Sequence, residues 1–379
     1  MQVDAVLCFS HLRWGFVFQR PNHLMLRAAR SWRVFYIEEP LFDAPHAQLH
    51  TEPVAPGMLR VVPRLTPGER DPEPRIQALL RDLCHAEGIK RALHWYYTPM
   101  MLGVSAGLPR DLVVYDCMDE LANFLFAPPE LEERERALLA MADVVFTGGR
   151  ALYEAKRSRH RNVHAMPSSV DVAHFAQARC ALPEPADQAA IPRPRFGYCG
   201  VIDERMDLSL IAGIARLRPD WQLIMLGPVV KIDPAELPTR PNIHYLGLKT
   251  YEDLPGYLAG WDAALLPFAL NDATRYVSPT KTPEYLAAGK PVVSTAIRDV
   301  VEPYGRLGIV AIAAGEEAFV SALESAQAPR DSDVDARRDA LLGEMSWNAT
   351  WQRMLQLIDQ AHASRASQPM AVESAGHHV

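Results

Sequence analysis

Short apolar runs alternate with segments of helical character along most of the chain. The run at residues 3–9 is apolar at nearly every position, as expected of a strand buried on both faces of a sheet. Similar runs occupy residues 34–37, 112–115, 144–147, 163–166, 196–199, 222–226, 243–246, 263–267, 292–294 and 308–312. Strands separated by helices predict an α/β fold with parallel sheets and right-handed crossovers.

A proline-rich stretch divides this rhythm into two halves. Residues 181–194 contain few large apolar side chains, which is typical of a linker. We therefore expect two Rossmann-like, doubly wound domains, at residues 1–180 and 195–345. A last helix is expected at residues 346–362. Residues 363–379 are small and polar without periodicity, which predicts a disordered tail.

The composition excludes several classes of protein. The chain has 379 residues, 49% hydrophobic and 22% charged, as in ordinary soluble globular proteins. The net charge of −7 argues against a nucleic-acid binder. No apolar run approaches the ~20 residues of a membrane span, and the first residues lack the positive start of a signal peptide. Five scattered cysteines without metal-ligand spacing indicate a reducing cytoplasm and no metal site.

The strongest candidate site lies at residues 278–294, where a polar loop leads into a short helix and a buried strand. Thr282 can cap that helix, with Lys281 just outside its N-terminus and Glu284 in its first turn. Free N–H groups beside a lysine can hold a diphosphate while a carboxylate binds a ribose. The alternative is that Glu284 only complements the helix dipole.

Further candidates follow strands of the second half, because doubly wound domains bind ligands at the carboxyl ends of their strands. Gly200 permits close backbone approach and Arg205 can offer a fork to phosphate, although Arg205 could equally form a surface ion pair. Lys231 supplies a second cation. Polar side chains suited to a donor molecule come before the candidate helix: Asn271, Asp272, Thr274 and Ser278.

The first half offers groups for proton transfer. His11 follows the first strand and could act as acid, base or donor, although a lone loop histidine is more often structural. Asp116 and Asp119 follow the strand at residues 112–115 and could bind hydroxyls or accept a proton, or Asp119 could cap the next helix. Arg13 and Trp14 are candidates for the acceptor side.

Two other patterns narrow the chemistry. No Gly-x-Gly-x-x-Gly follows a strand and no phosphate-binding loop of the Walker type occurs, so nicotinamide and flavin cofactors are not supported. A basic run begins at Lys156 and ends at Arg161. It could touch the inner face of an anionic membrane, but a solvated helix end is the favoured explanation, because cations also favour helix C-termini.

Together these motifs resemble bacterial glycosyltransferases of the GT-B fold, in the broad retaining family 4 group. The chain is most similar to a subgroup that opens with Ser-His-Leu-Arg-Trp and Gln-Arg-Pro-x-His-Leu, here within residues 10–24. The resemblance extends through residues 115–120, 142–147, 200–207 and 267–294. It implies two domains facing a cleft, with the C-terminal helix packing back, and transfer of a sugar from a nucleoside-diphosphate sugar to a hydroxyl acceptor.

The resemblance also implies roles for particular residues. Glu284 matches the ribose-binding second glutamate of a Glu-x7-Glu element, and Arg205 and Lys281 match positions that contact the donor diphosphate. Two departures stand out. Tyr276 occupies the position of the first glutamate, and the usual histidine of the first domain is replaced around Asp116.

We therefore expect a cytoplasmic glycosyltransferase of surface polysaccharide or glycoconjugate assembly, with a UDP-sugar favoured as donor and a glycan or lipid-linked acceptor. It needs no cofactor and no metal, because basic side chains can stabilise the leaving diphosphate. Two alternatives remain, namely a nucleotide-sugar epimerase on the same fold and a non-catalytic nucleotide-sugar sensor.

Overall fold

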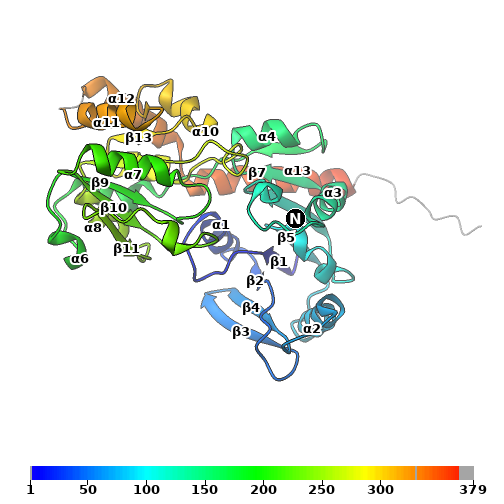
Figure 1. Cartoon of the computed structure of the whole chain (residues 1–379). Coiled ribbons are helices and arrows are strands. Elements are labelled where there is room, and N and C mark those ends of the chain that lie inside the picture. The colour runs from blue at the N-terminus through cyan, green and yellow to red at the C-terminus, as the bar shows by residue number, and fades with distance from the viewer. Residues whose placement is uncertain (1, 329–330, 367–379) are drawn as a thin grey trace, which may run out of the picture.

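The computed structural model describes residues 2–328 and 331–366, which form two α/β domains side by side (Figure 1). The first domain has an eight-stranded sheet in the order β3-β4-β2-β1-β5-β6-β7-β8, in which only β3 runs antiparallel to its neighbour. Its strands are β1 Ala5–Ser10, β2 Arg33–Glu38, β3 Gln48–Ala55, β4 Met58–Arg64, β5 Ala92–Tyr96, β6 Leu112–Cys117, β7 Val144–Thr147 and β8 Val163–Ala165. Its helices are α1 Arg20–Ala28, α2 Pro72–Ala86, α3 Leu131–Met141 and α4 Arg150–Lys156.

The second domain has a six-stranded, all-parallel sheet in the order β11-β10-β9-β12-β13-β14. Its strands are β9 Arg195–Cys199, β10 Gln222–Leu226, β11 Ile243–Gly247, β12 Ala263–Leu266, β13 Val292–Ser294 and β14 Ala311–Ile312. The helices of this half are α5 Val172–Ala176, α6 Ala186–Ala189, α7 Leu208–Leu217, α8 Leu254–Ala259, α9 Lys281–Ala287, α10 Arg298–Val300, α11 Glu316–Ala326, α12 Ser332–Glu344 and α13 Trp347–Ala366.

The first strand shows why the expectation of a doubly wound sheet is confirmed. Side chains of a strand point alternately to the two faces. In β1, Leu7 and Phe9 join one hydrophobic cluster while Val6 and Cys8 join another on the opposite face. Because both faces are covered by helices, the strand has to be apolar throughout, which is the pattern seen in the sequence.

Three strands of the first domain, β3, β4 and β5, were not predicted from the sequence. β3 and β4 contain prolines and charged residues, and β3 lies at the edge of the sheet with an exposed middle. β5 is completely buried but contains His94, whose Nε2 makes a 2.9 Å hydrogen bond with the Pro109 carbonyl. Polar residues interrupt the apolar pattern in β3 and β4 and again in β5. In the structure the polar groups of β3 reach solvent at the edge of the sheet, and the buried His94 of β5 is hydrogen-bonded.

The chain enters the hydrophobic core of the second domain before the expected linker. Val170, Phe175 and Ala178 already belong to the hydrophobic core of the second domain. Within residues 181–194, α6 forms and Gln188 is completely buried, donating to the Tyr257 carbonyl at 3.0 Å. The expected boundary at residue 180 is therefore too late, and the proline-rich stretch is a packed part of the second domain.

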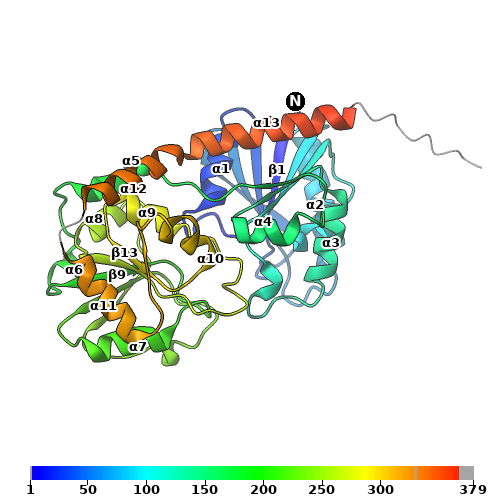
Figure 2. The same cartoon turned by 90° about the horizontal axis from the view of Figure 1, so that it is seen from above.

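The final helix returns to the first domain, as expected. Figure 2 shows α13, in red, running from the second domain along the first. Trp347, Trp351, Met354 and Ile358 are buried in the core of the first domain. The helix continues to residue 366, so residues 363–366 are helical rather than part of a disordered tail, and residues 367–379 lie outside the described residues.

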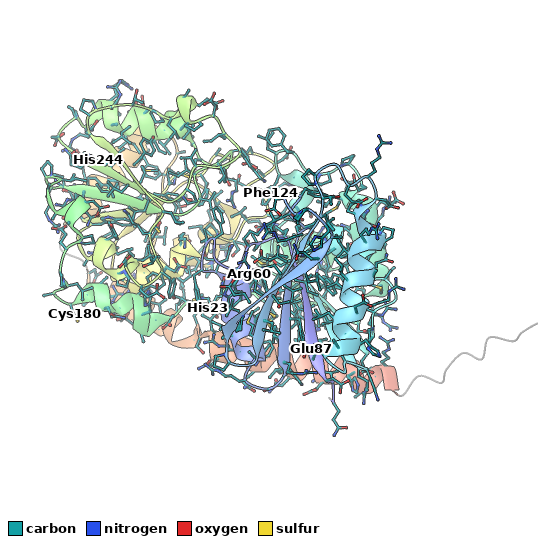
Figure 3. All side chains as sticks on the ribbon, turned by 90° about the horizontal axis from the view of Figure 1, so that it is seen from below. His23, Arg60, Glu87, Phe124, Cys180 and His244 are labelled. Carbon is teal, nitrogen blue, oxygen red and sulfur yellow. The ribbon has the colours of Figure 1, made fainter. Side chains whose placement is uncertain are left out.

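One histidine joins α1 to this returning helix. The ring of His23 stacks on Trp347 with 4.5 Å between centroids and 12° between planes. Figure 3 labels His23 on the side of the first domain that meets the second. Burial, together with the positive charge of Arg27, lowers the pKa of His23 to about 3.

We predict that His23 makes stability depend on pH. Its folded-state pKa lies below the ordinary value of 6.5. Between these two pKa values the imidazole is protonated in the unfolded chain and uncharged in the folded chain. The stabilising contribution is complete above pH 6.5 and decreases as the pH falls towards 3. Between pH 6.5 and 5 the expected loss is about 2 kcal/mol, measurable as a fall in the urea midpoint.

The variant His23→Phe keeps the aromatic stack and removes the titrating group. Its urea midpoint should depend less steeply on pH than that of the unsubstituted protein. His85→Phe, at an exposed position of α2, is the control and should keep the original slope. Equal slopes for His23→Phe and the unsubstituted protein would contradict the assignment.

Candidate active site

A cavity of about 360 Å³ opens between the two domains. The first domain contributes the loop after β1, at residues 14–18. The second contributes residues that follow β9, β10 and β11, together with Lys281 at the start of α9. The cavity thus lies at the carboxyl ends of the parallel strands, where doubly wound domains bind their ligands.

The helix α9 brings the two strongest candidates together at this cavity. Lys281 Nζ lies 2.9 Å from Glu284 Oε2, and the two side chains are only 15% and 12% exposed. Burial opposes the charge on Lys281, but the Glu284 carboxylate outweighs it and raises the pKa of the lysine. Glu284 therefore does more than complement the helix dipole, since it holds a buried cation in place.

The start of this helix differs from the prediction in one respect. The helix begins at Lys281 with Thr280 in the N-cap position, whereas Thr282 lies inside the first turn and is completely buried. Tyr285 fixes the helix against the end of β9, because its hydroxyl accepts a 2.7 Å hydrogen bond from the Cys199 backbone N–H. This contact places Lys281 beside Gly200 in the cavity wall.

Arg205 lies in the loop after β9 and is also paired. Its Nε and Nη2 donate to both carboxylate oxygens of Asp203, at 2.7 to 3.1 Å. Burial opposes its charge, but Asp203 outweighs this and raises the pKa of Arg205. The intradomain ion pair considered in the sequence analysis therefore exists. The arginine keeps 23% of its side chain exposed.

An aromatic ring of the first domain faces Arg205 and Lys231. The ring centroid of Phe124 is 5.4 Å from the Arg205 guanidinium carbon and 4.9 Å from Lys231 Nζ. Phe124 is labelled in Figure 3 on the side of its domain that faces the second. The neighbouring Leu125 N–H donates to Glu204 Oε1 at 3.1 Å. Cation–π contacts and this hydrogen bond join the domains across the cleft.

Asp119 of the first domain faces both of these cations, and His11 of the same domain lies near Lys231. Burial raises the pKa of Asp119, against the attraction of Arg205 and Lys231. Burial lowers the pKa of His11 to about 4, and Lys231 contributes to this. Within residues 2–328 and 331–366, His11 Nδ1 has no hydrogen-bond partner. At neutral pH His11 is therefore an uncharged imidazole with a free nitrogen.

Asp116 lies in a different environment from the one expected. It is fully buried at the end of β6, where Arg20 Nη2 donates to Oδ1 at 2.8 Å and Arg20 Nε donates to both oxygens at 3.1 Å. Arg20 also donates to the Met166 carbonyl at 2.6 Å. The geometry makes Asp116 an internal ion-pair partner that cannot touch a ligand in the cleft.

The two acceptor-side candidates have partners within the first domain. Arg13 donates to Glu38 Oε2 at 3.1 Å and to the Glu39 carbonyl at 2.6 Å. The Trp14 N–H donates to the other Glu38 oxygen at 2.8 Å, and its ring packs against Tyr36. Trp14 lines the cavity beside the second domain, so it lies on the side expected for the donor.

Several polar candidates of the second domain shape its loops. The Thr274 side chain is buried and its hydroxyl donates to the Ala269 carbonyl at 2.5 Å. Asn271 Nδ2 donates to the Glu204 carbonyl at 3.1 Å. Asp272 is exposed, and its own carbonyl accepts from Asn123 Nδ2 of the first domain at 2.9 Å. These contacts connect the loop after β12 with both sides of the cleft.

Ser278 lies where α4 of the first domain meets the second. Asp299, from α10, accepts the backbone N–H groups of Arg150 and Ala151 at 2.8 and 2.9 Å and also bonds to Ser278. A side chain at Gly149 would collide with both Asp299 and Ser278. The first turn of α4 is therefore capped from the other domain, which the sequence analysis did not foresee.

Tyr276, which departs from the pattern of the resembling family, packs against other side chains. Its ring contacts the hydrophobic cluster of the first domain, and the Arg275 guanidinium carbon lies 5.4 Å from the ring centroid. An aromatic side chain thus lies at the position where the resembling family carries its first glutamate.

The basic run beginning at Lys156 is not a uniform surface patch. Lys156 is completely buried, and its Nζ lies 2.7 Å from an oxygen of both Glu120 and Glu135. Arg159 also pairs with Glu135. The predicted membrane contact is therefore wrong for Lys156, because its charge is neutralised inside the first domain.

Some residues at the cleft gave no signal in the sequence. Phe124, Phe18 and Tyr251 are aromatic residues without a motif around them, and an aromatic residue is more often part of a core. Asp299 lies far along the chain from the helix that it caps. Only the contact between domains shows that these side chains belong to one site.

Within residues 2–328 and 331–366, no helix is long and apolar enough to cross a membrane. The same residues contain no group of three or more His, Cys, Asp or Glu side chains arranged to hold a metal ion.

The second domain matches a known family. Residues 193–327 match the family model described as Glycosyl transferases group 1. A Bacillus subtilis (strain 168) protein named as a teichuronic acid biosynthesis glycosyltransferase, TuaH, is 26% identical over 238 residues. That alignment covers 58% of this chain and 60% of the relative, so it spans less than two thirds of the relative's length.

Solved structures with the same fold cover nearly all of the chain. Sucrose-phosphate synthase from Thermosynechococcus elongatus has a TM-score of 0.68 at 16% identity, covering 95% of this chain and 100% of that one. Anabaena Alr3699/HepE in complex with UDP has a TM-score of 0.65 at 13% identity, covering 94% and 100%. A trehalose-6-phosphate structure from E. coli bound with UDP-2-fluoro glucose has a TM-score of 0.66 at 12% identity, covering 94% and 99%.

These comparisons show the fold of the chain. It has the GT-B arrangement of two Rossmann-like domains, and residues 193–327 of its second domain match the group 1 family model.

We predict that substitution of the two aspartates near the end of β6 has very different effects on stability. Asp116→Ala leaves the Arg20 charge buried and unpaired, so it should lower the free energy of unfolding by about 3 to 5 kcal/mol. Asp119→Ala removes a carboxylate that faces the cleft and should cost at most about 1 kcal/mol. Urea denaturation of both variants measures the difference, and equal stability of Asp116→Ala and the unsubstituted protein would contradict it.

Proposed function

We propose that this protein is a glycosyltransferase that moves a sugar from a nucleoside-diphosphate sugar to a hydroxyl acceptor. The observation that carries the proposal is the arrangement of the cavity. Lys281 lies at its wall and is ion-paired with Glu284, in a region that matches the glycosyltransferase group 1 family model. Arg205, beside it, faces Asp119 of the other domain.

The second domain binds the donor. Lys281 and Arg205 neutralise the charge that develops on the leaving diphosphate, and Gly200 allows the backbone to approach it. Lys231 adds a third positive charge at the same edge of the cleft. Glu284 exchanges part of its contact with Lys281 for the hydroxyls of the ribose.

The first domain positions the acceptor. His11 is uncharged at neutral pH because its pKa is about 4, and its Nδ1 can accept the proton of an acceptor hydroxyl or hold that hydroxyl by a hydrogen bond. Asp119 is the second candidate for this role. Asp116 has no part in it because Arg20 occupies both of its oxygens.

We propose a UDP-hexose as donor and retention of configuration at the transferred sugar. The support for UDP is that similar folds have been solved with UDP and with UDP-2-fluoro glucose. The support for retention is the resemblance to the retaining family 4 group around Glu284. The cation set supplies electrostatic stabilisation, so the proposed reaction requires neither metal nor cofactor.

We propose that the acceptor is a glycan or a lipid-linked glycan in the assembly of a surface polysaccharide, in the cytoplasm. The support is the similarity to a protein named for teichuronic acid biosynthesis. All five cysteines are free thiols, which fits a reducing compartment.

A second candidate is a non-catalytic protein that binds a nucleotide sugar. Tyr276 favours it, because it packs against the first domain where a catalytic relative would offer a carboxylate to the donor sugar. Donor binding without transfer to any glycan acceptor would favour this candidate. Conversion of the donor without acceptor would instead favour an epimerase.

We predict that nucleoside diphosphates stabilise the protein through Glu284 and Arg205. A ligand at 100 times its dissociation constant should add about 2.7 kcal/mol to the folded state. Glu284→Ala and Arg205→Ala should each reduce this shift, since a hydrogen bond to a charged group contributes about 1.5 to 3 kcal/mol. A thermal-shift titration with UDP, GDP and ADP measures the effect.

The control is Glu302→Ala, which removes an exposed carboxylate of the same domain that pairs with its neighbour Arg306. It should keep the full shift. Unchanged nucleotide binding in both Glu284→Ala and Arg205→Ala would show that the donor site lies elsewhere. The absence of any shift for the unsubstituted protein would overturn the proposed function.

A further inference from the structure

The loop after β1 is held at both ends and projects between them into the cavity. Asn22 fixes the two ends, since its Nδ2 donates to the Trp14 carbonyl and its Oδ1 accepts from the Gln19 N–H, both at 3.0 Å. Glu38 accepts the Trp14 N–H from the other side. Residues 15–18 are thereby presented to the second domain as a preformed loop.

Phe16 is the exposed aromatic side chain of this loop. It lines the cavity and keeps 39% of its surface exposed. Among the residues that the structure describes, no ring contact of Phe16 occurs, whereas Phe18 packs against Tyr251 with 4.6 Å between ring centroids. Phe18 therefore joins the loop to the second domain, and Phe16 presents a ring that no neighbouring ring covers.

The opposite wall offers an unsatisfied hydroxyl. Tyr251 lines the cavity after β11, and its ring stacks on His174 at 4.1 Å. Its hydroxyl is buried and has no hydrogen-bond partner in the described part of the chain. Burial raises the pKa of Tyr251, and the negative charge of Glu284 adds to this. A buried hydroxyl without a partner is costly unless a ligand supplies one.

The cavity therefore combines chemically different groups. Its lining includes the free ring of Phe16, the apolar side chains of Leu226 and Leu254, and the cation of Lys281. A ligand that matches it has a flat apolar ring joined through a hydroxylated group to an anion. A nucleoside diphosphate has these three parts in this order.

We propose that Phe16 of the first domain stacks on the base of a nucleoside diphosphate, and that the Tyr251 hydroxyl hydrogen-bonds its ribose. This proposal rests on the proposed donor site, and it assigns nucleoside recognition to both domains rather than to the second alone. Binding of the nucleotide then bridges the cleft, so the first domain takes part in donor binding before any acceptor arrives.

The test is calorimetric titration of the full chain with UDP, UMP and inorganic pyrophosphate. Stacking of a base on an aromatic side chain predicts that Phe16→Ala raises the dissociation constants of UDP and UMP by about 5- to 150-fold. The dissociation constant of pyrophosphate should stay the same, because it has no base. Phe16→Tyr keeps the ring and should bind UDP as the unsubstituted protein does.

Tyr251→Phe removes only the hydroxyl and should raise the dissociation constants of UDP and UMP about 3- to 10-fold. The dissociation constant of pyrophosphate should again stay the same. Phe42→Ala, at another exposed phenylalanine of the same domain outside the cavity lining, is the matched control. It should bind all three probes normally.

Two results would overturn the inference and leave the proposed function standing. One is unchanged UDP binding in Phe16→Ala while Glu284→Ala loses it. The other is an equal loss of affinity for UDP and for pyrophosphate in Phe16→Ala, which would show that the substitution disturbs the whole cleft and does not remove a stacking contact. Failure of the unsubstituted protein to bind any nucleotide would overturn both proposals.

Discussion

The packing of α13 against the first domain is the interaction on which the cleft depends. This helix comes directly after the second domain in sequence, yet Trp347, Trp351 and Ile358 are buried in the core of the first. The chain therefore crosses between the domains near residue 170 and again at the start of α13. Two crossings and a buried aromatic stack on His23 hold the domains together, so that the ends of β9 and β10 and the loop after β1 face one cavity. Figure 2 shows α13 lying along both domains.

The charges in the cleft are arranged so that each cation already has a local partner. Arg205 is held by Asp203, and Lys281 by Glu284. A partly buried cation without a partner would destabilise the fold, and a paired one keeps its position in the absence of ligand. The pairs lower the net positive charge, so a diphosphate has to compete with carboxylates. The ring of Phe124 adds an attraction that comes from the opposite domain.

The sequence predicted the site in part, and the aspartates after β6 show where prediction stopped. Asp116 and Asp119 are three residues apart and were equal candidates. The strand continues through Asp116 and directs its side chain into the domain towards Arg20, whereas Asp119 lies beyond the strand and faces Arg205. Lys156 looked like a surface charge, but two glutamates from other segments surround it. Sequence motifs name residue types, and contacts between distant segments decide their roles.

By itself the sequence determined the α/β class, eleven of the strands with small shifts at their ends, and the helix that carries Lys281 and Glu284. These follow from local periodicity and from the residues at strand ends, which act over a few neighbouring positions. Only the tertiary structure decided where the domains divide, that Asp299 caps α4 from the other domain, and that Phe16 and Tyr251 line one cavity. Such contacts join segments more than a hundred residues apart, and no local pattern records them, because they depend on how two complete domains pack together.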